Sequence, residues 1–185
     1  MRTLFAALLV TALTSRLPAQ RDSTHPRLDS LALDTLFNGP AYTFTGTEDT
    51  LLLARAFEET YRLGLGEGGK IREPGSLCLA VGRLHSSDAP ASVLRVLADH
   101  HPRVRPASSC RPEIRGGLFT RLVDSASGES AWILTIIALS SRSGDTIAVH
   151  SSHYVAPLWA AGWVCDLARR GRDWRVVRCS MTWIS

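Results

Sequence analysis

The sequence is poor in several features, and each shortage excludes a class of protein. Lys70 is the only lysine among 21 basic residues, an arginine bias typical of GC-rich bacterial genomes. The formal charge is only +4, and no basic stripe is interleaved with aromatic residues, so no nucleic-acid partner is predicted. No apolar run approaches the roughly 18 residues of a membrane-spanning helix, so no membrane span is predicted.

Motifs that carry chemistry are also scarce. The sequence has no C-x-x-C pair and no G-x-S-x-G elbow, so zinc-ribbon, thioredoxin and serine-hydrolase sites lack support. Residues 64–70 contain G-x-G-x-x-G followed by Lys70, but a helix precedes this stretch and Pro74 soon follows it. A phosphate loop needs a strand before it and a helix after it, so we expect a helix-capping glycine and a loop.

No metal or cofactor is predicted. His150 and His153 are spaced for a helix, but they lie in a segment that is predicted to be a strand, where residues three apart point to opposite faces.

The first 20 residues have the three-part pattern of a secretory signal peptide. A positive start at Met1 and Arg2 is followed by an apolar stretch over residues 4–13 and then by a polar segment. We expect cleavage after Ala19 or Gln20. No cysteine lies at this junction, so no lipid anchor is predicted, and the protein is expected to be secreted or periplasmic.

Residues 21–45 are expected to form an N-terminal arm with a short helix at 28–37, and residues 46–185 a single domain. The clearest helix spans 48–63, with Thr47 as its N-cap. One face of this helix carries a stripe at helical spacing, formed by Leu52, Leu53, Ala56, Phe57, Thr60, Tyr61 and Leu63.

The rest of the chain predicts one strand, one helix and a series of strands. Residues 76–84 read as a buried strand, and a helix opens at Pro90 with Ser87 or Asp88 as its cap. The proline-rich residues 102–112 are expected to be a loop. Strands follow at 117–124, 131–140, 145–156, 160–169 and 173–184. The segment 131–140 is apolar on both faces and should be central.

This order of elements predicts the α+β class. We expect N-terminal helices packed on a curved, mainly antiparallel sheet that ends in a C-terminal meander.

The four cysteines predict two disulfides in an oxidising compartment. If residues whose numbers sum to 344 are paired in the last hairpin, Cys165 faces Cys179 and Asp166 faces Arg178. The same register pairs Leu167 with Val177 and Trp163 with Met181, which suits a stable sheet. Its weak point is a three-residue loop in which Gly171 comes first rather than last. Four cysteines allow three connectivities, and this register favours Cys165–Cys179 with Cys78–Cys110.

Three polar residues share one face of the strand 145–156: His150, Ser152 and Tyr154. They are the predicted ligand-facing groups if a cavity lies between the helix 48–63 and the sheet. Leu53, Phe57 and Tyr61 would then form an apolar wall. Asp166 is the one carboxylate predicted to lie near such a ligand. The alternative is that this face is exposed.

The order of helices and strands, closing on Gly171, Trp174 and Val176 in a G-x-x-W-x-V pattern, resembles the NTF2-like (SnoaL-type) α+β cone superfamily. The resemblance implies a fold that carries isomerases, hydrolases and non-enzymatic binders, so it does not select a function. It assigns no catalytic residue in this sequence.

The main hypothesis is an exported, non-catalytic domain that binds a small apolar molecule or a partner protein. One alternative is an NTF2-like enzyme that uses acid–base catalysis on a small hydrophobic substrate. Another is a structural component of the cell envelope, dimeric through an exposed sheet face.

Overall fold

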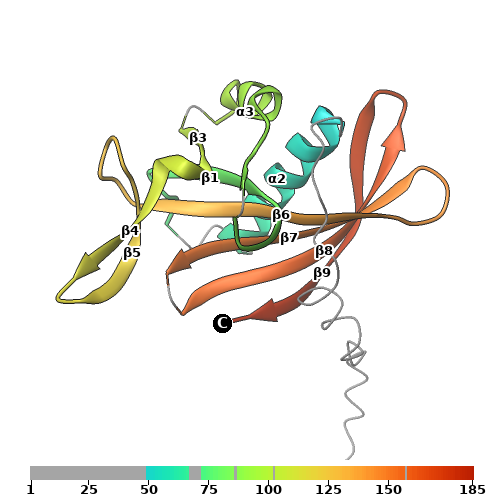
Figure 1. The fold of residues 1–185 in the computed structure, drawn as a ribbon. Helices are drawn as coiled ribbons and strands as arrows, with labels where there is room; N and C mark the ends of the chain where they lie inside the picture. Colours follow the sequence, from blue (N-terminus) through green and yellow to red (C-terminus); the bar gives the residue numbers. More distant parts are fainter. Residues whose placement is uncertain (1–48, 67–71, 86, 102, 157) are drawn as a thin grey trace, which may run out of the picture.

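The structure is a computed structural model that describes residues 49–66, 72–85, 87–101, 103–156 and 158–185 (Figure 1). The predicted signal peptide, the arm at 21–45 with its helix, and Thr47 lie outside the described residues. The elements are α2 (Thr50–Leu65), β1 (Ser76–Val81), the 3-10 turn η1 (Arg83–His85), β2 (Ser87–Asp88), α3 (Ala91–Ala98), β3 (Val104–Pro106), the 3-10 turn η2 (Ala107–Ser109), β4 (Cys110–Arg115), β5 (Leu118–Asp124), β6 (Ala131–Ser141), β7 (Thr146–Ala156), β8 (Trp159–Arg170) and β9 (Asp173–Ile184).

The main sheet has the strand order β2-β1-β6-β7-β8-β9, with β3 also paired to β1. Strands β6 to β9 form an antiparallel meander, whereas β1 runs parallel to both β3 and β6. The predicted α+β class with a mostly antiparallel sheet is therefore confirmed. The expected curvature is not, because the sheet is open at its edges and is not strongly curled (Figure 1).

Strand β6 occupies the centre of the sheet, as its two apolar faces predict. It lies between β1 and β7, and its first six residues are buried. A strand covered on both faces needs apolar side chains at successive positions, because neighbours point to opposite sides.

Helix α2 begins two residues later than predicted, with Asp49 as its N-cap. The Asp49 carboxylate accepts hydrogen bonds from the backbone N–H groups of Leu51 and Leu52 at 2.9 and 3.2 Å. It also accepts one from Trp174 Nε1 at 3.0 Å. This carboxylate therefore satisfies the open end of the helix and ties it to β9. The helix ends at Leu65, and Gly66, with a φ of 70°, is its C-cap; a capping glycine in 64–70 was predicted, but the helix runs two residues further than expected.

The main core lies between the helices and one face of the sheet. Leu53 and Phe57 of α2 are 1% exposed, and they belong to one buried cluster with Val149 and Leu167 of the sheet. Burying a side chain of this size contributes about 1.5–3 kcal/mol. The helical stripe thus fills the space between helix and sheet, which is where a cavity was predicted.

The proline-rich segment 102–112 forms strands β3 and β4 around the turn η2, which corrects the predicted loop. Pro106 is the last residue of β3, so its missing N–H does not interrupt the pairing of that strand. The proline in β4 lies outside the main sheet, because β4 pairs only with β5. The predicted strand at 117–124 is present as β5, but it pairs with β4 in a separate two-stranded ribbon and is not part of the meander.

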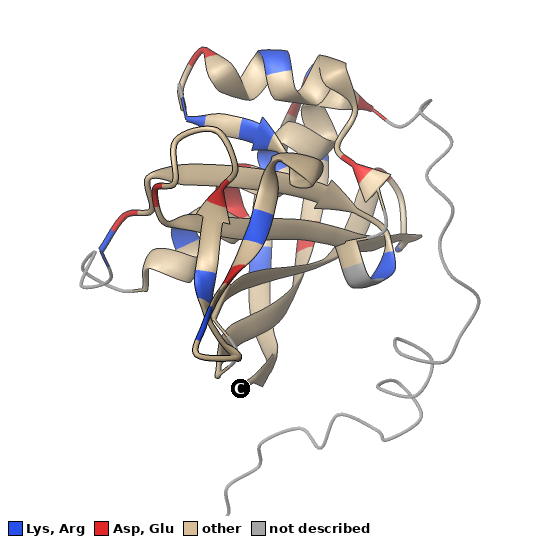
Figure 2. Cartoon of the chain, turned by 60° about the vertical axis from the view of Figure 1, so that its left-hand side comes forward, with Lys and Arg blue, Asp and Glu red and all other residues tan. Residues whose placement is uncertain are grey.

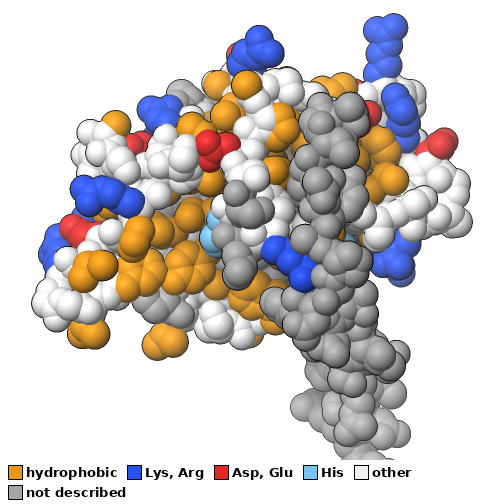
Figure 3. All heavy atoms as spheres, viewed as in Figure 1, with side chains coloured by type: hydrophobic (Ala, Val, Ile, Leu, Met, Phe, Trp, Pro, Cys, Tyr) orange, Lys and Arg blue, Asp and Glu red, His pale blue; other side chains and the backbone are white. Residues whose placement is uncertain are grey.

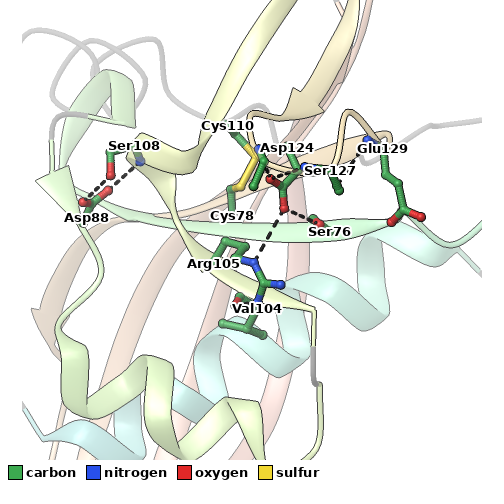
Figure 4. Close-up of a disulfide and its surroundings, with 11 residues drawn as sticks. Ser76, Cys78, Asp88, Val104, Arg105, Ser108, Cys110, Asp124, Ser127 and Glu129 are labelled. Carbon is green, nitrogen blue, oxygen red and sulfur yellow. Dashed lines mark hydrogen bonds and ion pairs between the residues drawn. A yellow bond between two sulfur atoms is a disulfide. The ribbon is translucent and has the colours of Figure 1, made fainter.

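The ribbon β4–β5 is fastened to β1 by a covalent bond and a buried carboxylate (Figure 4). Cys110 at the start of β4 forms a disulfide with Cys78 of β1, which is one of the two pairs predicted from the sequence. Asp124 at the end of β5 is 2% exposed and accepts a hydrogen bond from Ser76 Oγ at 2.9 Å. The backbone N–H of Ala126 and the Ser76 hydroxyl hold the pKa of Asp124 below its usual value.

The hairpin β8–β9 has the predicted cysteine pair but a different register near its turn. Cys165 is disulfide-bonded to Cys179 and Asp166 faces Arg178. Beyond them a β-bulge shifts the register, so Leu167 faces Val176 and not Val177. The bulge absorbs one residue and leaves a two-residue loop, in which Gly171 at the first position has a φ of 63°. That position suits glycine in a type II′ turn, so the weak point of the predicted register disappears.

The register also agrees with the burial of these residues, because side chains alternate between the two faces of a strand. Leu167 is fully buried, whereas Val177, the residue displaced by the bulge, is 62% exposed.

Helix α3 also differs from prediction at its start, because Pro90 is its N-cap and no side chain caps the helix by a hydrogen bond. Ser87 and Asp88 lie in β2 instead, and Asp88 binds the backbone N–H and hydroxyl of Ser108 at 2.7 and 2.8 Å (Figure 4).

Candidate functional site

Strand β7 has two different faces, and both are covered. Val149 belongs to the core beneath α2, and His153 lies 5.6 Å from Trp132 and 5.0 Å from Trp163, measured between ring centroids. The alternate residues His150, Ser152 and Tyr154 point away from that core, because successive side chains of a strand point to opposite faces. The predicted trio therefore shares one face, and that face is the one opposite α2.

A cavity of about 380 Å³ lies against this face. The cavity was expected between α2 and the sheet, and this prediction is wrong. Leu53, Phe57 and Tyr61 do not line the observed cavity. Its lining comes from η1, β6, β7, β8 and β9: Arg83, His85, Thr135, Ile137, His150, Ser151, Ser152, His153, Tyr154, Trp163, Thr182 and Trp183. Figure 3 shows hydrophobic side chains gathered beside the β4–β5 ribbon, over the strands β7 to β9.

The turn η1 forms one wall of the cavity. Gly82, directly before the turn, and His85, its last residue, have φ values of 85° and 58°, which turn the chain back over the sheet. A positive φ is easy for glycine but strained for histidine. His85 Nδ1 and the Thr135 hydroxyl share a hydrogen bond, which holds the imidazole against β6. The turn is thus fixed to the strand that forms the cavity floor.

Aromatic rings form the wall nearest the ribbon. Tyr154 stacks on Phe119 of β5 with a centroid distance of 6.0 Å, and its ring lies 6.2 Å from that of His85. Phe119 and Tyr154 both pack against the second buried cluster, which contains Cys78 and Ile133. The ribbon, held by Cys78–Cys110, therefore supports the position of Tyr154.

Another part of the cavity wall depends on a close approach between β8 and β9. A Cβ added to Gly162 would lie 2.2 Å from Nε1 of Trp183, so the indole rests directly on the glycine backbone. A second β-bulge in this hairpin, between Gly162 and Trp163, lies beside the contact. Glycine at 162 is therefore what allows Trp183 to lie along the sheet and line the cavity.

Burial sets the ionisation of the side chains at the site. Burial lowers the pKa of His85, and burial together with the charge of Arg142 lowers the pKa of His150 against a smaller opposing effect of Asp166. Burial also raises the pKa of Tyr154. At pH 7 these groups are therefore neutral, and they present imidazole and phenol hydrogen-bonding groups to the cavity.

Asp166, the predicted carboxylate, does not line the cavity. Its two oxygens accept hydrogen bonds from Arg178 at 2.7 Å and from Arg142 at 3.3 Å. Burial by itself raises the pKa of Asp166, but these two hydrogen bonds outweigh it and hold the pKa below its usual value. Asp166 is an ionised partner of two arginines, which fits a structural role.

No group of three or more His, Cys, Asp or Glu that could hold a metal occurs in the described part of the chain. His150 and His153 lie on opposite faces of β7, as their spacing on a strand predicts. Charged residues of both signs are interspersed along the described chain (Figure 2).

Sequence reasoning does not find His85, Thr135 and Trp183. Each lies in a different element, and no spacing in the sequence connects them. The glycines at 82 and 162 are the only local signals, because each permits a backbone conformation or a close approach that another residue would hinder.

Comparisons with models of protein families, with curated proteins and with solved structures found no match. Among the described residues, no helix is both long enough and apolar enough to span a membrane.

Proposed function

We propose that this protein is an exported binding protein that holds a small, mainly apolar molecule in the cavity between η1, β7 and β9. The observation that carries the proposal is the cavity itself. Its volume of about 380 Å³ falls in the range of about 300–1,000 Å³ typical of ligand pockets. Tyr154 and Trp183 provide aromatic walls, and Thr135 and Ser152 provide a few polar groups that can orient a ligand.

Export is part of the proposal. The disulfides Cys78–Cys110 and Cys165–Cys179 are typical of proteins in oxidising compartments, and the first 20 residues are predicted to be a signal peptide.

The NTF2-like acid–base enzyme stays the alternative, and the carboxylate predicted for it does not line the cavity. Such an enzyme needs a group that can exchange a proton with the substrate. The predicted candidate, Asp166, is engaged by Arg142 and Arg178. The resemblance to the NTF2-like superfamily itself stays a prediction.

Titration with N-phenyl-1-naphthylamine, a neutral apolar dye that fluoresces in apolar surroundings, tests the proposal. We expect saturable binding by the wild-type protein. Ser152→Leu fills the cavity floor with a larger side chain and should weaken binding at least about tenfold, which corresponds to about 1.4 kcal/mol. Ser180→Leu is the matched control, because Ser180 is an exposed residue of β9 outside the cavity lining.

Circular dichroism should show that both variants are folded before the titrations are compared. Absence of saturable binding by the wild type, or equal affinity of the two folded variants, would contradict a ligand site in this cavity.

A further inference from the structure

Large apolar side chains are exposed at one end of the molecule. The tip of the β4–β5 ribbon carries Ile114 and Leu118, whose exposed fractions are 64% and 72%. Leu158, between β7 and β8, is 87% exposed, and Ile184, the last residue of β9, is 71% exposed. Single exposed apolar residues are normal on a protein surface, but several in one region mark a contact surface.

The fold brings these three segments to the same end. Ile184 of β9 pairs with Ala161 of β8, and Trp159 begins β8 beside the end of β7. The ribbon reaches the same place, because Phe119 stacks on Tyr154 of β7. The ribbon tip and the end of β9 lie on the lower side of the molecule in both Figure 1 and Figure 2. The apolar end is the group formed by Ile114, Leu118, Leu158, Trp159 and Ile184.

The side chains that border the apolar end are mainly cationic. Residues 111–121 of the ribbon include three exposed arginines, Arg111, Arg115 and Arg121, and one acid, Glu113, which leaves a net charge of +2. Glu113 accepts hydrogen bonds from both Arg115 and Arg121, at 3.0 and 2.7 Å, so one carboxylate is shared by two guanidiniums. Residues 146–165 and 179–185 contain no Asp, Glu, Lys or Arg.

The apolar end consists of projecting tips and not of a flat face. The ribbon is a separate two-stranded sheet that extends from the body of the molecule (Figure 1). Its turn contains Gly116 and Gly117, and a Cβ added at either position would meet no other atom within 4 Å. A protein partner would need a closely complementary surface to cover such tips. Lipid headgroups and acyl chains can rearrange around each tip separately.

We propose that the apolar end binds peripherally to a membrane surface that contains anionic phospholipids. Leu118 and Leu158 enter the boundary between headgroups and acyl chains, and Trp159 lies at the level of the headgroups, where tryptophan is enriched. The arginines of the ribbon attract the lipid phosphates, and each arginine near such a surface raises the affinity about fivefold. The proposal adds an interaction surface and does not depend on the proposed ligand of the cavity.

Cosedimentation of the exported protein with vesicles tests the proposal. One set of vesicles contains phosphatidylcholine mixed with phosphatidylglycerol, and the other contains phosphatidylcholine alone. We expect binding to the anionic vesicles to be at least about tenfold stronger, as two net positive charges near the surface imply. Added salt should reduce this difference, because it screens the attraction between exposed charges.

The double replacement Leu118→Ser with Leu158→Ser removes apolar surface from two of the tips. It should weaken binding to the anionic vesicles at least about tenfold, because less apolar surface then enters the membrane. The matched control is Leu51→Ser with Val177→Ser, which changes two exposed apolar residues outside the apolar end and should bind as the wild type does. Circular dichroism should show that both double variants are folded.

A second measurement does not depend on the folding of the leucine variant. Brominated phosphatidylcholine in the anionic vesicles should quench the tryptophan fluorescence of the wild type, and the quenching should be smaller in Trp159→Phe. Equal quenching in the two proteins would overturn the proposal, because Trp159 would then lie away from the membrane.

Three further outcomes would overturn the proposal. One is that the wild type binds neither set of vesicles, or binds both equally. Another is that the two folded double variants bind the anionic vesicles equally well. The third is a wild-type dimer that does not bind vesicles and that dissociates in Leu118→Ser with Leu158→Ser but not in the control, because the apolar end would then contact a second copy of the chain.

Discussion

At the scale of single residues, His153 shows how burial alone controls ionisation. Its ring lies between Trp132 and Trp163, and among the described residues neither ring nitrogen has a hydrogen-bond partner. Burial lowers the pKa of His153 to about 4. In the unfolded chain the pKa returns to its usual value of about 6.5, so between these values the unfolded state binds the proton more readily.

The stability of the protein should therefore be highest above about pH 6.5 and should fall as the pH approaches 4. His153→Phe keeps a ring between the two indoles and removes the titrating group. Between pH 7 and 4.5 the free energy of unfolding should fall in both proteins. The fall should be about 2 kcal/mol smaller in His153→Phe than in the wild type. Urea unfolding at both pH values measures the difference.

Some pH dependence should remain in His153→Phe, since burial also lowers the pKa of His85 and His150. The control is His100→Phe, at an exposed position just beyond α3, measured at the same two pH values. If His153→Phe has the same pH profile of stability as the wild type, His153 is not the source of the pH dependence.

A second prediction at this scale concerns Gly162 and Trp183. Gly162→Ala places a methyl group against the indole, and overpacking of this kind costs about 1–3 kcal/mol. In a Trp183→Ala background the clash is absent, so the same substitution should cost much less. A double-mutant cycle by urea unfolding measures the coupling. Equal costs in both backgrounds would show that the strain of Gly162→Ala arises elsewhere.

At the scale of elements, the two disulfides hold different pairs and should have separable effects. Cys165–Cys179 links neighbouring strands of one hairpin, with a sequence separation of 14. Replacing both of these cysteines by serine should lower the free energy of unfolding by about 3 kcal/mol in the chain-entropy model. The hairpin should still form, because its strand pairing and the Asp166–Arg178 ion pair remain. Denaturant unfolding under non-reducing conditions measures the loss.

The Cys78–Cys110 bond fastens the β4–β5 ribbon, which presents Phe119 to Tyr154 at the cavity. The double replacement Cys78→Ser with Cys110→Ser should therefore weaken dye binding as well as stability. The hairpin variant described above serves as its control and should bind the dye normally. If both disulfide variants bind equally well, the ribbon does not support the cavity wall.

At the scale of the whole molecule, the proposed export makes a prediction about the mature chain and its disulfides. Export should remove the first 19 or 20 residues, so the intact mass of the exported protein should match a chain that begins at Gln20 or Arg21. Peptide mapping without reduction should then join Cys78 to Cys110 and Cys165 to Cys179. Full-length protein retained in the cell, or a peptide that joins Cys110 to Cys165, would contradict this prediction.

Features that depend on neighbours in the chain could be predicted from the sequence. The apolar stripe of α2, the doubly covered strand β6 and the pair Cys165–Cys179 each follow from a periodicity or from a single register. A periodicity is carried by the residues of one element, so it survives whatever packs against that element.

Features that depend on partners from elsewhere in the chain could not be predicted. The proline-rich segment 102–112 becomes strand only because β1 and β5 offer edges for it to pair with. Asp49 replaces Thr47 as the cap of α2, and its carboxylate also binds Trp174, which is 125 residues away. The bulge at Asp166 and Leu167 likewise reflects the packing of Leu167 beneath α2.

The candidate site also has one feature that the sequence could predict and others that it could not. Alternation along β7 is enough to place His150, Ser152 and Tyr154 on a common face, but it treats the two faces of a strand alike. Which face meets the helices was decided by the side on which α2 packs, and α2 covers the face of Val149 and His153. The walls of the cavity include side chains of η1 and β9, and β5 supports Tyr154 through Phe119; these side chains meet β7 only when the chain has folded. Local pattern thus determined the strands and their bracing, while tertiary packing decided where a ligand could bind.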